Sequence, residues 1–219
     1  MKRITGRTTK RSWDGQRCMR PVVLVHGIFD SGTKFDRMAQ FLNGRGFRPL
    51  APSLSPSNGK VGLDELALQL RAFVNEQIPS QEPFDLIGFS MGGLVSRYYL
   101  QRLGGMERVR RFITISSPHH GSYWAHVIGN AACRQMRPGS VFLEELNRDM
   151  KMLEHVRFVS LWTPLDLMIV PASSSRLDVG EEVVLQVAAH PLMVTSRLSL
   201  ELIVKLLQEE TIPQVPKRR

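Results

Sequence analysis

The chain has 219 residues, 42% of them hydrophobic and 22% charged, which is typical of a globular protein with one domain. No apolar run reaches the roughly 18 residues that a membrane-spanning helix requires. The net charge of +9 comes from residues 1–20, which carry +6, and residues 213–219, which carry +3, whereas residues 21–212 carry no net charge. This distribution argues against a nucleic-acid-binding surface on the domain.

Both termini are therefore predicted to be flexible basic tails, residues 1–20 and 213–219, on either side of a single domain, residues 21–212. The tails could contact an anionic membrane surface, although a role in solubility explains them more simply. The first twenty residues contain no hydrophobic stretch, so we expect no secretory signal and a cytoplasmic protein, peripheral at a membrane at most. Cys18 and Cys133 are then predicted to be reduced, and a disulfide between them stays open as the alternative.

In chain order, continuous apolar runs predict six strands, and helical spacing of apolar residues predicts four helices. The predicted strands are residues 21–25, 47–51, 84–88, 109–115, 156–162 and 181–187. The predicted helices are residues 63–78, 92–103, 141–153 and 192–207, with irregular segments at 52–62 and 116–139. Long apolar strands that alternate with helices indicate an α/β protein with a mainly parallel central sheet and helices on both faces.

The third predicted strand runs into the sequence Gly-Phe-Ser-Met-Gly at residues 88–92, and a predicted helix follows directly. This is the pattern of a nucleophile elbow, a strand-to-helix turn so tight that only glycine fits at 88 and 92, with Ser90 presented at its tip. The pentapeptide alone is a weak signal, because a glycine-rich turn with an N-capping serine gives the same letters. The strand before it and the helix after it favour the nucleophile.

An activated serine needs a histidine base, and the histidine needs an acid that fixes its tautomer. In parallel sheets such groups gather beyond the carboxyl ends of the strands. Asp166 follows the fifth predicted strand, His190 follows the sixth, and no other histidine lies beyond Asp166. We therefore predict Ser90, Asp166 and His190 as the catalytic triad. The simpler alternatives are a turn-capping aspartate and a histidine at a helix start.

Seven other acidic residues compete with Asp166 for the role of the acid. They lie on or just after a helix, or at the opposite edge of the sheet, and are Glu144, Glu145, Asp149, Glu154, Asp178, Glu181 and Glu182. Their positions place them away from the carboxyl ends of the strands, so Asp166 is preferred.

Two backbone N–H groups are needed to stabilise the oxyanion that forms on the substrate. One is predicted to be that of Met91, directly after the serine at a helix N-terminus. The other must come from the loop after the first strand, which reads His26-Gly27-Ile28-Phe29. We assign it to Ile28, with Phe29 as the alternative. His26 is expected to support this loop by hydrogen bonding, and a role as the base is its less favoured alternative.

With these motifs the chain resembles the small bacterial lipases and esterases of the α/β-hydrolase superfamily over about residues 21–207. The matching residues are His26-Gly27, Gly88-Phe89-Ser90-Met91-Gly92-Gly93, Ser116-Ser117-Pro118-His119-His120-Gly121-Ser122, Asp166 and His190. The resemblance implies the same nucleophile, acid, base and oxyanion donors, and no metal or organic cofactor. His119 and His120 are expected to be structural rather than a metal pair, because nothing supplies the further ligands.

The sequence departs from these enzymes in two places. Ala189 precedes the predicted base where the family often has glycine, and Pro191 follows it. The strands that usually precede the His-Gly motif are missing, because only a basic tail precedes residue 21. The resemblance therefore implies a minimal α/β-hydrolase fold with a sheet of about six strands.

An acyl chain requires an apolar groove beside the nucleophile. The residues near the predicted site that could line it are Phe29, Met91, Ile169, Val170, Leu192 and Met193. Tyr123 and Trp124 in the irregular segment are open to two interpretations, contact with a lipid interface or packing on the core.

These features together predict a serine carboxylic ester hydrolase, of lipase or esterase type, that cleaves lipid-like esters through an acyl-enzyme. An acyl-thioesterase or acyltransferase would use the same three residues and is the first alternative. A catalytically silent scaffold and a basic adaptor protein are two further alternatives, the latter resting on the tails alone. The expected partner is an ester or lipid substrate and not a nucleic acid, and the sequence predicts neither the oligomeric state nor the acyl length.

Overall fold

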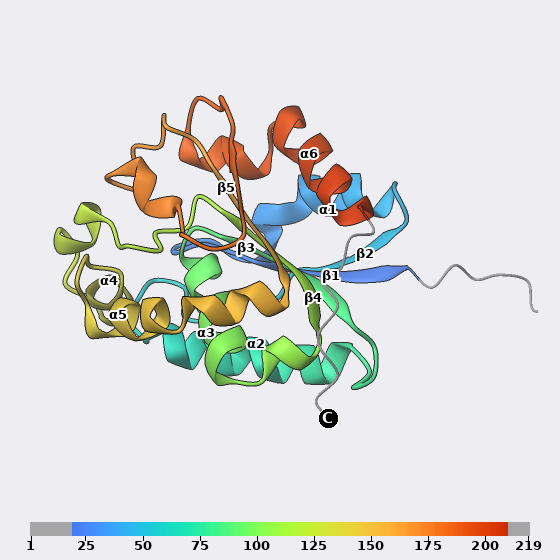
Figure 1. The fold of residues 1–219 in the computed structure, drawn as a ribbon, viewed down its shortest axis with the longest axis horizontal. Coiled ribbons are helices and arrows are strands. Elements are labelled where there is room, and N and C mark those ends of the chain that lie inside the picture. The colour runs from blue at the N-terminus through green and yellow to red at the C-terminus, as the bar shows by residue number, and fades with distance from the viewer. Residues whose placement is uncertain (1–18, 210–219) are drawn as a thin grey trace, which may run out of the picture.

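The computed structural model describes residues 19–209, so most of both predicted tails, residues 1–18 and 210–219, lies outside the described residues. Within this part the chain forms a sheet of six strands that are all parallel, in the order β2-β1-β3-β4-β5-β6 (Figure 1). The strands are β1 Arg20–Val25, β2 Phe47–Leu50, β3 Phe84–Phe89, β4 Val109–Ile115, β5 Arg157–Trp162 and β6 Glu181–Val184. The predicted parallel sheet is confirmed.

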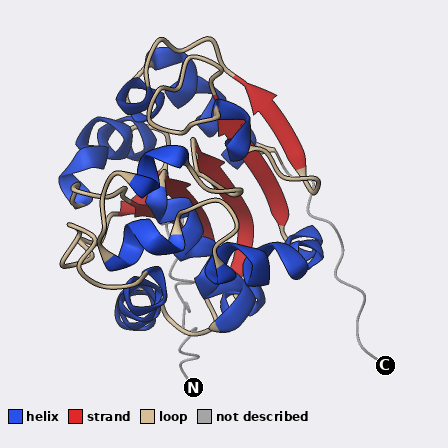
Figure 2. Cartoon of the chain, turned by 90° about the vertical axis from the view of Figure 1, so that its left-hand side faces the viewer, coloured by secondary structure: helices blue, strands red, loops and turns tan. Residues whose placement is uncertain are grey.

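Helices cover both faces of this sheet, as predicted (Figure 1). One face carries α1 Asp36–Asn43 and α6 Arg197–Gln208, and the other carries α2 Leu63–Gln77, α3 Met91–Arg102 and α5 Val141–Arg148. The short helix α4 Ala131–Gln135 lies beyond the edge where the strands end. Figure 2 looks onto that edge, where the loops that follow the strands gather.

The core consists of two apolar layers, one on each face of the sheet. Alternate residues of β1 enter different layers, since Val23 and Val25 pack towards α2 and α3 whereas Val22 and Leu24 pack towards α1 and α6. A strand that is buried on both faces must be apolar throughout, which explains its continuous apolar run.

One helix, one strand and two further predicted helices differ from the sequence prediction. Helix α1 was not predicted, because its eight residues show too short a pattern to stand out. The predicted strand 181–187 is wrong in its second half, since β6 ends at Val184, although the N–H of Leu185 still donates to the carbonyl of Trp162 at 2.8 Å. The predicted helices 141–153 and 192–207 are each divided into an α-helix and a 3₁₀ turn.

The second of these divisions has a clear local cause. The side chain of Ser196 accepts a hydrogen bond from the N–H of Ser199 at 3.2 Å and thereby starts α6, while residues 190–194 form the 3₁₀ turn. In the part of the chain that the structure describes, no helix is both long and apolar enough to cross a membrane.

Candidate active site

Ser90 lies at the turn between β3 and α3 with a backbone φ of 54° and ψ of −124°. This positive φ is rare for a residue with a side chain and indicates a strained turn. A Cβ atom on Gly88 would lie 2.5 Å from the Cα of Gly93, and one on Gly92 would lie 2.1 Å from the carbonyl oxygen of Val25. Glycine is therefore required on both sides of the serine, which is the geometry of a nucleophile elbow.

Asp166 and His190 are in direct contact beyond the ends of β5 and β6. The Nδ1 atom of His190 donates to Oδ2 of Asp166 at 2.7 Å, and the backbone N–H groups of Met168 and Ile169 both donate to Oδ1 at 2.9 Å. Burial raises the pKa of Asp166, but the hydrogen bond and charge of His190 and the two N–H groups lower it more, so this pKa lies below its ordinary value. The carboxylate is thus held ionised and fully bonded.

The loops that carry these two residues are fixed to each other. The hydroxyl of Thr163, just after β5, donates to the carbonyl of Val187 at 2.7 Å. Thr163 is completely buried, so this bond is shielded from water. It sets the spacing between the segment that leads to Asp166 and the segment that leads to His190.

The imidazole of His190 lies against the residue that precedes Ser90. Its ring packs on Phe89, the residue before Ser90, with 4.7 Å between the ring centroids. Ser90 and His190 line one cavity of about 300 Å³. Asp166 is the hydrogen-bond partner of Nδ1. The other ring nitrogen of His190, Nε2, makes no hydrogen bond to any of the described residues and is therefore available to accept a proton.

The loop after β1 is held in one conformation beneath this cavity. The N–H of Phe29, a residue with φ of 62°, donates to the carbonyl of Ser57 at 2.8 Å, so it is not free to act as an oxyanion donor. Within residues 19–209 the N–H groups of Ile28 and Met91 have no acceptor. The geometry therefore favours Ile28 over Phe29 as the partner of Met91.

His26 supports the same loop from within the core. It is completely buried, its Nδ1 donates to the carbonyl of Gly27 at 2.9 Å, and its Nε2 accepts from the N–H of Leu54 at 2.9 Å. Both ring nitrogens are used, so the alternative role as the base has no atom available for it.

Of the residues predicted to line the acyl groove, Phe29 and Ile169 do line the cavity. Val170, Leu192 and Met193 are not among its lining residues. Met193 is fully buried in the core layer beneath α6, and Leu192 points outward with 45% of its surface exposed. Val170 is used by its backbone, whose N–H donates to the hydroxyl of Ser122 at 3.0 Å.

Met91 was also expected beside the groove, but its side chain lies in the opposite core layer. The apolar wall comes instead from the irregular segment 116–139 and from the loop after Asp166. Its members are Pro118, Trp124, Ala125, Ile128, Cys133, Met136 and Met168. Two features of the sequence indicated this wall: the irregular segment 116–139 is long, and it follows the strand 109–115, which lies next to the strand that ends at the nucleophile elbow.

The aromatic pair in that segment is exposed, so the interpretation as core packing is wrong. Tyr123 is 62% exposed and Trp124 is 54% exposed. The ring nitrogen of Trp124 donates to the carbonyl of Leu167 at 2.8 Å, which ties segment 116–139 to the loop after Asp166.

His119 and His120 follow β4 and take part in packing. The completely buried His119 contacts the hydroxyl of Thr114 at 3.1 Å and Nη1 of the buried Arg97 at 3.5 Å. Burial, then Arg97, then His120 lower its pKa well below the ordinary value, so it is neutral. Within residues 19–209 there is no group of three or more His, Cys, Asp or Glu that could hold a metal ion.

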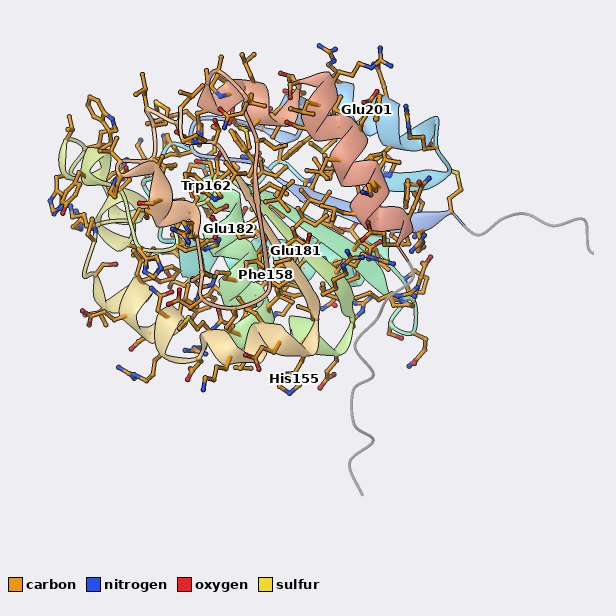
Figure 3. The ribbon with its side chains drawn as sticks, turned by 45° about the horizontal axis from the view of Figure 1, so that its top comes forward. His155, Phe158, Trp162, Glu181, Glu182 and Glu201 are labelled. Carbon is orange, nitrogen blue, oxygen red and sulfur yellow. The ribbon has the colours of Figure 1, made fainter. Side chains whose placement is uncertain are left out.

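The competing acids Glu181 and Glu182 lie on β6, the edge strand (Figure 3). Glu182 accepts from the ring nitrogen of Trp162 at 2.9 Å and from Arg176 at 3.0 Å. Glu181 lies 3.7 Å from Arg157. None of these contacts involves His190. Cys133 is buried and free in the described part of the chain, and Cys18 lies outside it.

Comparisons with solved structures identify the fold. The chain superposes on the mature lipase BlEst2 of Bacillus licheniformis with a TM-score of 0.70 and 18% identity, covering 87% of this chain and 93% of that one. For lipase B of Aspergillus fumigatus the TM-score is 0.74 and the identity 19%, covering 94% of this chain and 56% of that one. The predicted α/β-hydrolase fold is confirmed.

Sequence comparisons identify the family. The lysosomal thioesterase PPT2 of Mus musculus and that of Homo sapiens are each 32% identical over 108 residues, which is 48% of this chain but only 35% of those proteins. The family model described as palmitoyl protein thioesterase matches residues 21–158, a segment that includes Ser90 and Ile28 but ends before Asp166 and His190. Because this match covers more than half of the chain, the protein belongs to the palmitoyl protein thioesterase family.

Proposed function

We propose that the protein is a serine hydrolase that cleaves acyl esters of lipid character through an acyl-enzyme. One observation carries the proposal: the strained Ser90 and His190, whose ring is hydrogen bonded to the buried Asp166, line the same apolar cavity. A serine, a histidine with one free ring nitrogen and an ionised acid behind it are the parts that nucleophilic acyl transfer requires.

In the proposed reaction the hydroxyl of Ser90 attacks the acyl carbon while Nε2 of His190 takes its proton. Asp166 keeps the proton on Nδ1 and stabilises the imidazolium that forms. The N–H groups of Ile28 and Met91 bind the oxyanion. His190 then gives its proton to the leaving oxygen as the carbon–oxygen bond breaks. Water, deprotonated by His190, then attacks the acyl carbon; the bond to Oγ of Ser90 breaks, His190 returns the proton to that oxygen, and the acid is released.

The acyl chain is proposed to lie against the wall formed by Ala125, Ile128 and Met136. These side chains enclose an apolar cavity of about 300 Å³, within the range of small-molecule sites. Burial of the chain there would hold the carbonyl at Ser90, so that binding also orients the reacting atoms.

A thioester is the second candidate substrate, and the family membership favours it. The relatives PPT2 of mouse and human are named as thioesterases, and this chain spans about a third of their length. The same residues would act, with a thiol in place of the alcohol as the leaving group. Turnover of an oxygen ester and a thioester with the same acyl chain separates the two candidates.

The central test is labelling by a fluorophosphonate, which reacts only with an activated serine. We expect stoichiometric labelling of the wild type and none of Ser90→Ala, together with loss of p-nitrophenyl ester hydrolysis. Labelling of Ser90→Ala at the wild-type level would assign the nucleophile to another residue, and an unlabelled wild type would favour the silent scaffold. Removal of residues 1–18 and 213–219, which leaves β1 intact, should leave ester turnover unchanged, whereas loss of function would favour the adaptor alternative.

Contact with a lipid surface is proposed as well, because exposed apolar side chains border the cavity. The exposed residues that line it are Phe29, Trp124, Ile128 and Met168, and exposed residues within three positions of these in the chain are Tyr123, Val127, Leu165 and Leu167. Replacing Val127 and Leu167 together by serine should lower binding to anionic vesicles, while Leu68→Ser on α2 should not. Undiminished binding of the double variant would contradict this contact. The cytoplasmic location stays a prediction that fractionation of cells would test.

A further inference from the structure

The cavity has a polar end as well as an apolar wall. Asp30, in the loop after β1, and Lys34, in the 3₁₀ turn Gly32–Phe35, both line it. A Cβ atom on Gly27 would lie 3.2 Å from Oδ2 of Asp30 and 3.3 Å from the Cβ of Ser90. The carboxylate and the nucleophile therefore both lie against Gly27, so this polar end adjoins the reacting serine.

The ammonium group of Lys34 is available to a ligand. Its Nζ lies 3.5 Å from Oδ1 of Asp30, and it donates no hydrogen bond to any residue in the part of the chain that the structure describes. The side chain is 24% exposed and so is partly shielded from water. An ammonium carries three donors, and Lys34 lines the cavity with the ion pair to Asp30 as its polar contact among the described residues, so donors remain for a ligand.

The position of Lys34 relative to His190 places it near the leaving group of the substrate rather than near the acyl chain. Nζ of Lys34 lies 5.6 Å from the centre of the Phe89 ring, and the imidazole of His190 packs on the same ring at 4.7 Å. The group that His190 protonates is the leaving group, so the leaving group must lie on the Phe89 side. The acyl wall comes from other parts of the chain, the segment 116–139 and the loop after Asp166.

We infer that Lys34 is a specificity-determining residue that binds an anionic oxygen, such as a phosphate oxygen, on the leaving group of the substrate. This inference rests on the proposed function, because it needs Ser90 and His190 to act on an acyl bond. Asp30 holds the ammonium in place and repels further negative charge, so the site suits one anionic oxygen rather than several.

A surface ion pair between Lys34 and Asp30 is the simpler explanation. Exposed pairs four residues apart in the chain contribute little to stability, and this pair is longer than a charge-assisted hydrogen bond. Such a pair would not distinguish between substrates. The two explanations therefore differ in one measurable respect, the dependence of turnover on the charge of the leaving group.

The experiment compares two thioesters with the same octanoyl chain, one of coenzyme A, which carries phosphates, and one of N-acetylcysteamine, which is neutral. We expect Lys34→Met to lower kcat/KM about tenfold for the coenzyme A thioester, mainly through KM, and less than about twofold for the neutral thioester. Arg37→Met on α1 is the matched control, since Arg37 is exposed and does not line the cavity. It should change neither value.

A second arm distinguishes the source of the phosphate. It compares a lysophosphatidylcholine with a monoacylglycerol of the same acyl chain. A selective effect of Lys34→Met on the phospholipid alone assigns the anion to a lipid head group, and one on the coenzyme A thioester alone assigns it to a thiol carrier. Either result supports the inference. Asp30→Asn should act in the opposite direction and raise the preference for the charged member of each pair.

An equal effect of Lys34→Met on both members of each pair, or no effect on any, overturns the inference and leaves the proposed function standing. A wild type that turns over none of the four substrates and fails to react with the fluorophosphonate overturns both. A wild type that reacts with the fluorophosphonate but turns over none of the four overturns only the assignment of Lys34.

Discussion

Two buried histidines lie at the same end of the sheet, and their surroundings differ. His190 is hydrogen bonded to the carboxylate of Asp166 and opens on the cavity. His119 lies beside the guanidinium of Arg97, is completely buried and does not line the cavity. Burial alone therefore does not produce a base. An acidic partner and one ring nitrogen that faces the substrate are also needed.

The region around His119 serves to hold the cavity wall in place. Arg97 donates to the carbonyl of Leu146 at 2.8 Å and to the side chain of Asn147 at 2.9 Å. Asn147 in turn donates to the carbonyl of His119 at 3.0 Å, which fixes α5 to the loop after β4. Burial and the charge of Arg102 lower the pKa of Arg97 to about 9, and it remains charged at neutral pH.

The largest expected difference between the two regions is in turnover. His190→Asn should lower kcat about 10⁶-fold, because both proton transfers lose their carrier. His119→Asn should change kcat less than about tenfold, because the residue contacts no substrate. Hydrolysis of a soluble p-nitrophenyl ester measures both. Comparable losses in the two variants would remove the distinction drawn between the histidines.

The next effect concerns the acid behind the base. Asp166→Asn should lower kcat by about 10⁴-fold, because an amide at this place no longer selects the proper tautomer of His190 or stabilises its charge. Asp178→Asn, in an exposed loop before β6, is the control and should retain wild-type kcat. A large loss in Asp178→Asn with activity retained in Asp166→Asn would reassign the acid.

A smaller effect, on stability, is expected in the other region. Arg97→Met should lower the free energy of unfolding by about 2–4 kcal/mol, because it leaves the side-chain oxygens of Asn147 and Gln101 without the donor that Arg97 provides. Urea titration measures the change. The control is Arg102→Met, which removes a partly exposed ion pair to Asp149 and should lower the free energy of unfolding by under about 1 kcal/mol. Equal losses of unfolding free energy in the two variants would mean that the buried hydrogen bonds of Arg97 contribute no more to stability than the exposed ion pair of Arg102.

The smallest effect is a dependence of stability on pH. The pKa of His119 is lowered in the fold, so the unfolded chain binds more protons as the pH falls below the ordinary value of 6.5. Its contribution is fully present above pH 6.5 and is lost as the pH falls towards its folded pKa. The free energy of unfolding should decrease by at most about 1.4 kcal/mol per pH unit from this one group. The slope between pH 7 and 5 should be shallower in His119→Asn, and an unchanged slope would contradict the assignment.

Much of the fold follows from the sequence, because strands buried on both faces leave long apolar runs. Ser90 was predicted from the glycine-rich motif between a strand and a helix, and Asp166 and His190 from the rule that side chains after parallel strands meet at the carboxyl edge. The roles of the three residues stay a proposal. The groove was predicted less well, since closeness to a catalytic residue along the chain does not tell where a side chain points. Leu192 and Met193 lie two and three residues after His190, yet the 3₁₀ turn directs Leu192 outward and Met193 into the core.

The anchored loop after β1 has a consequence for how the enzyme would be switched on. With the Phe29 amide fixed to Ser57 and the ring of His26 bridging Gly27 and Leu54, the free amide of Ile28 is preorganised. Oxyanion donors that are already in place need no rearrangement when the reaction begins. A hydrolase with this arrangement would be active as soon as substrate enters the cavity. Its activity would then be controlled by the access of substrate to the cavity and not by a conformational activation of the site.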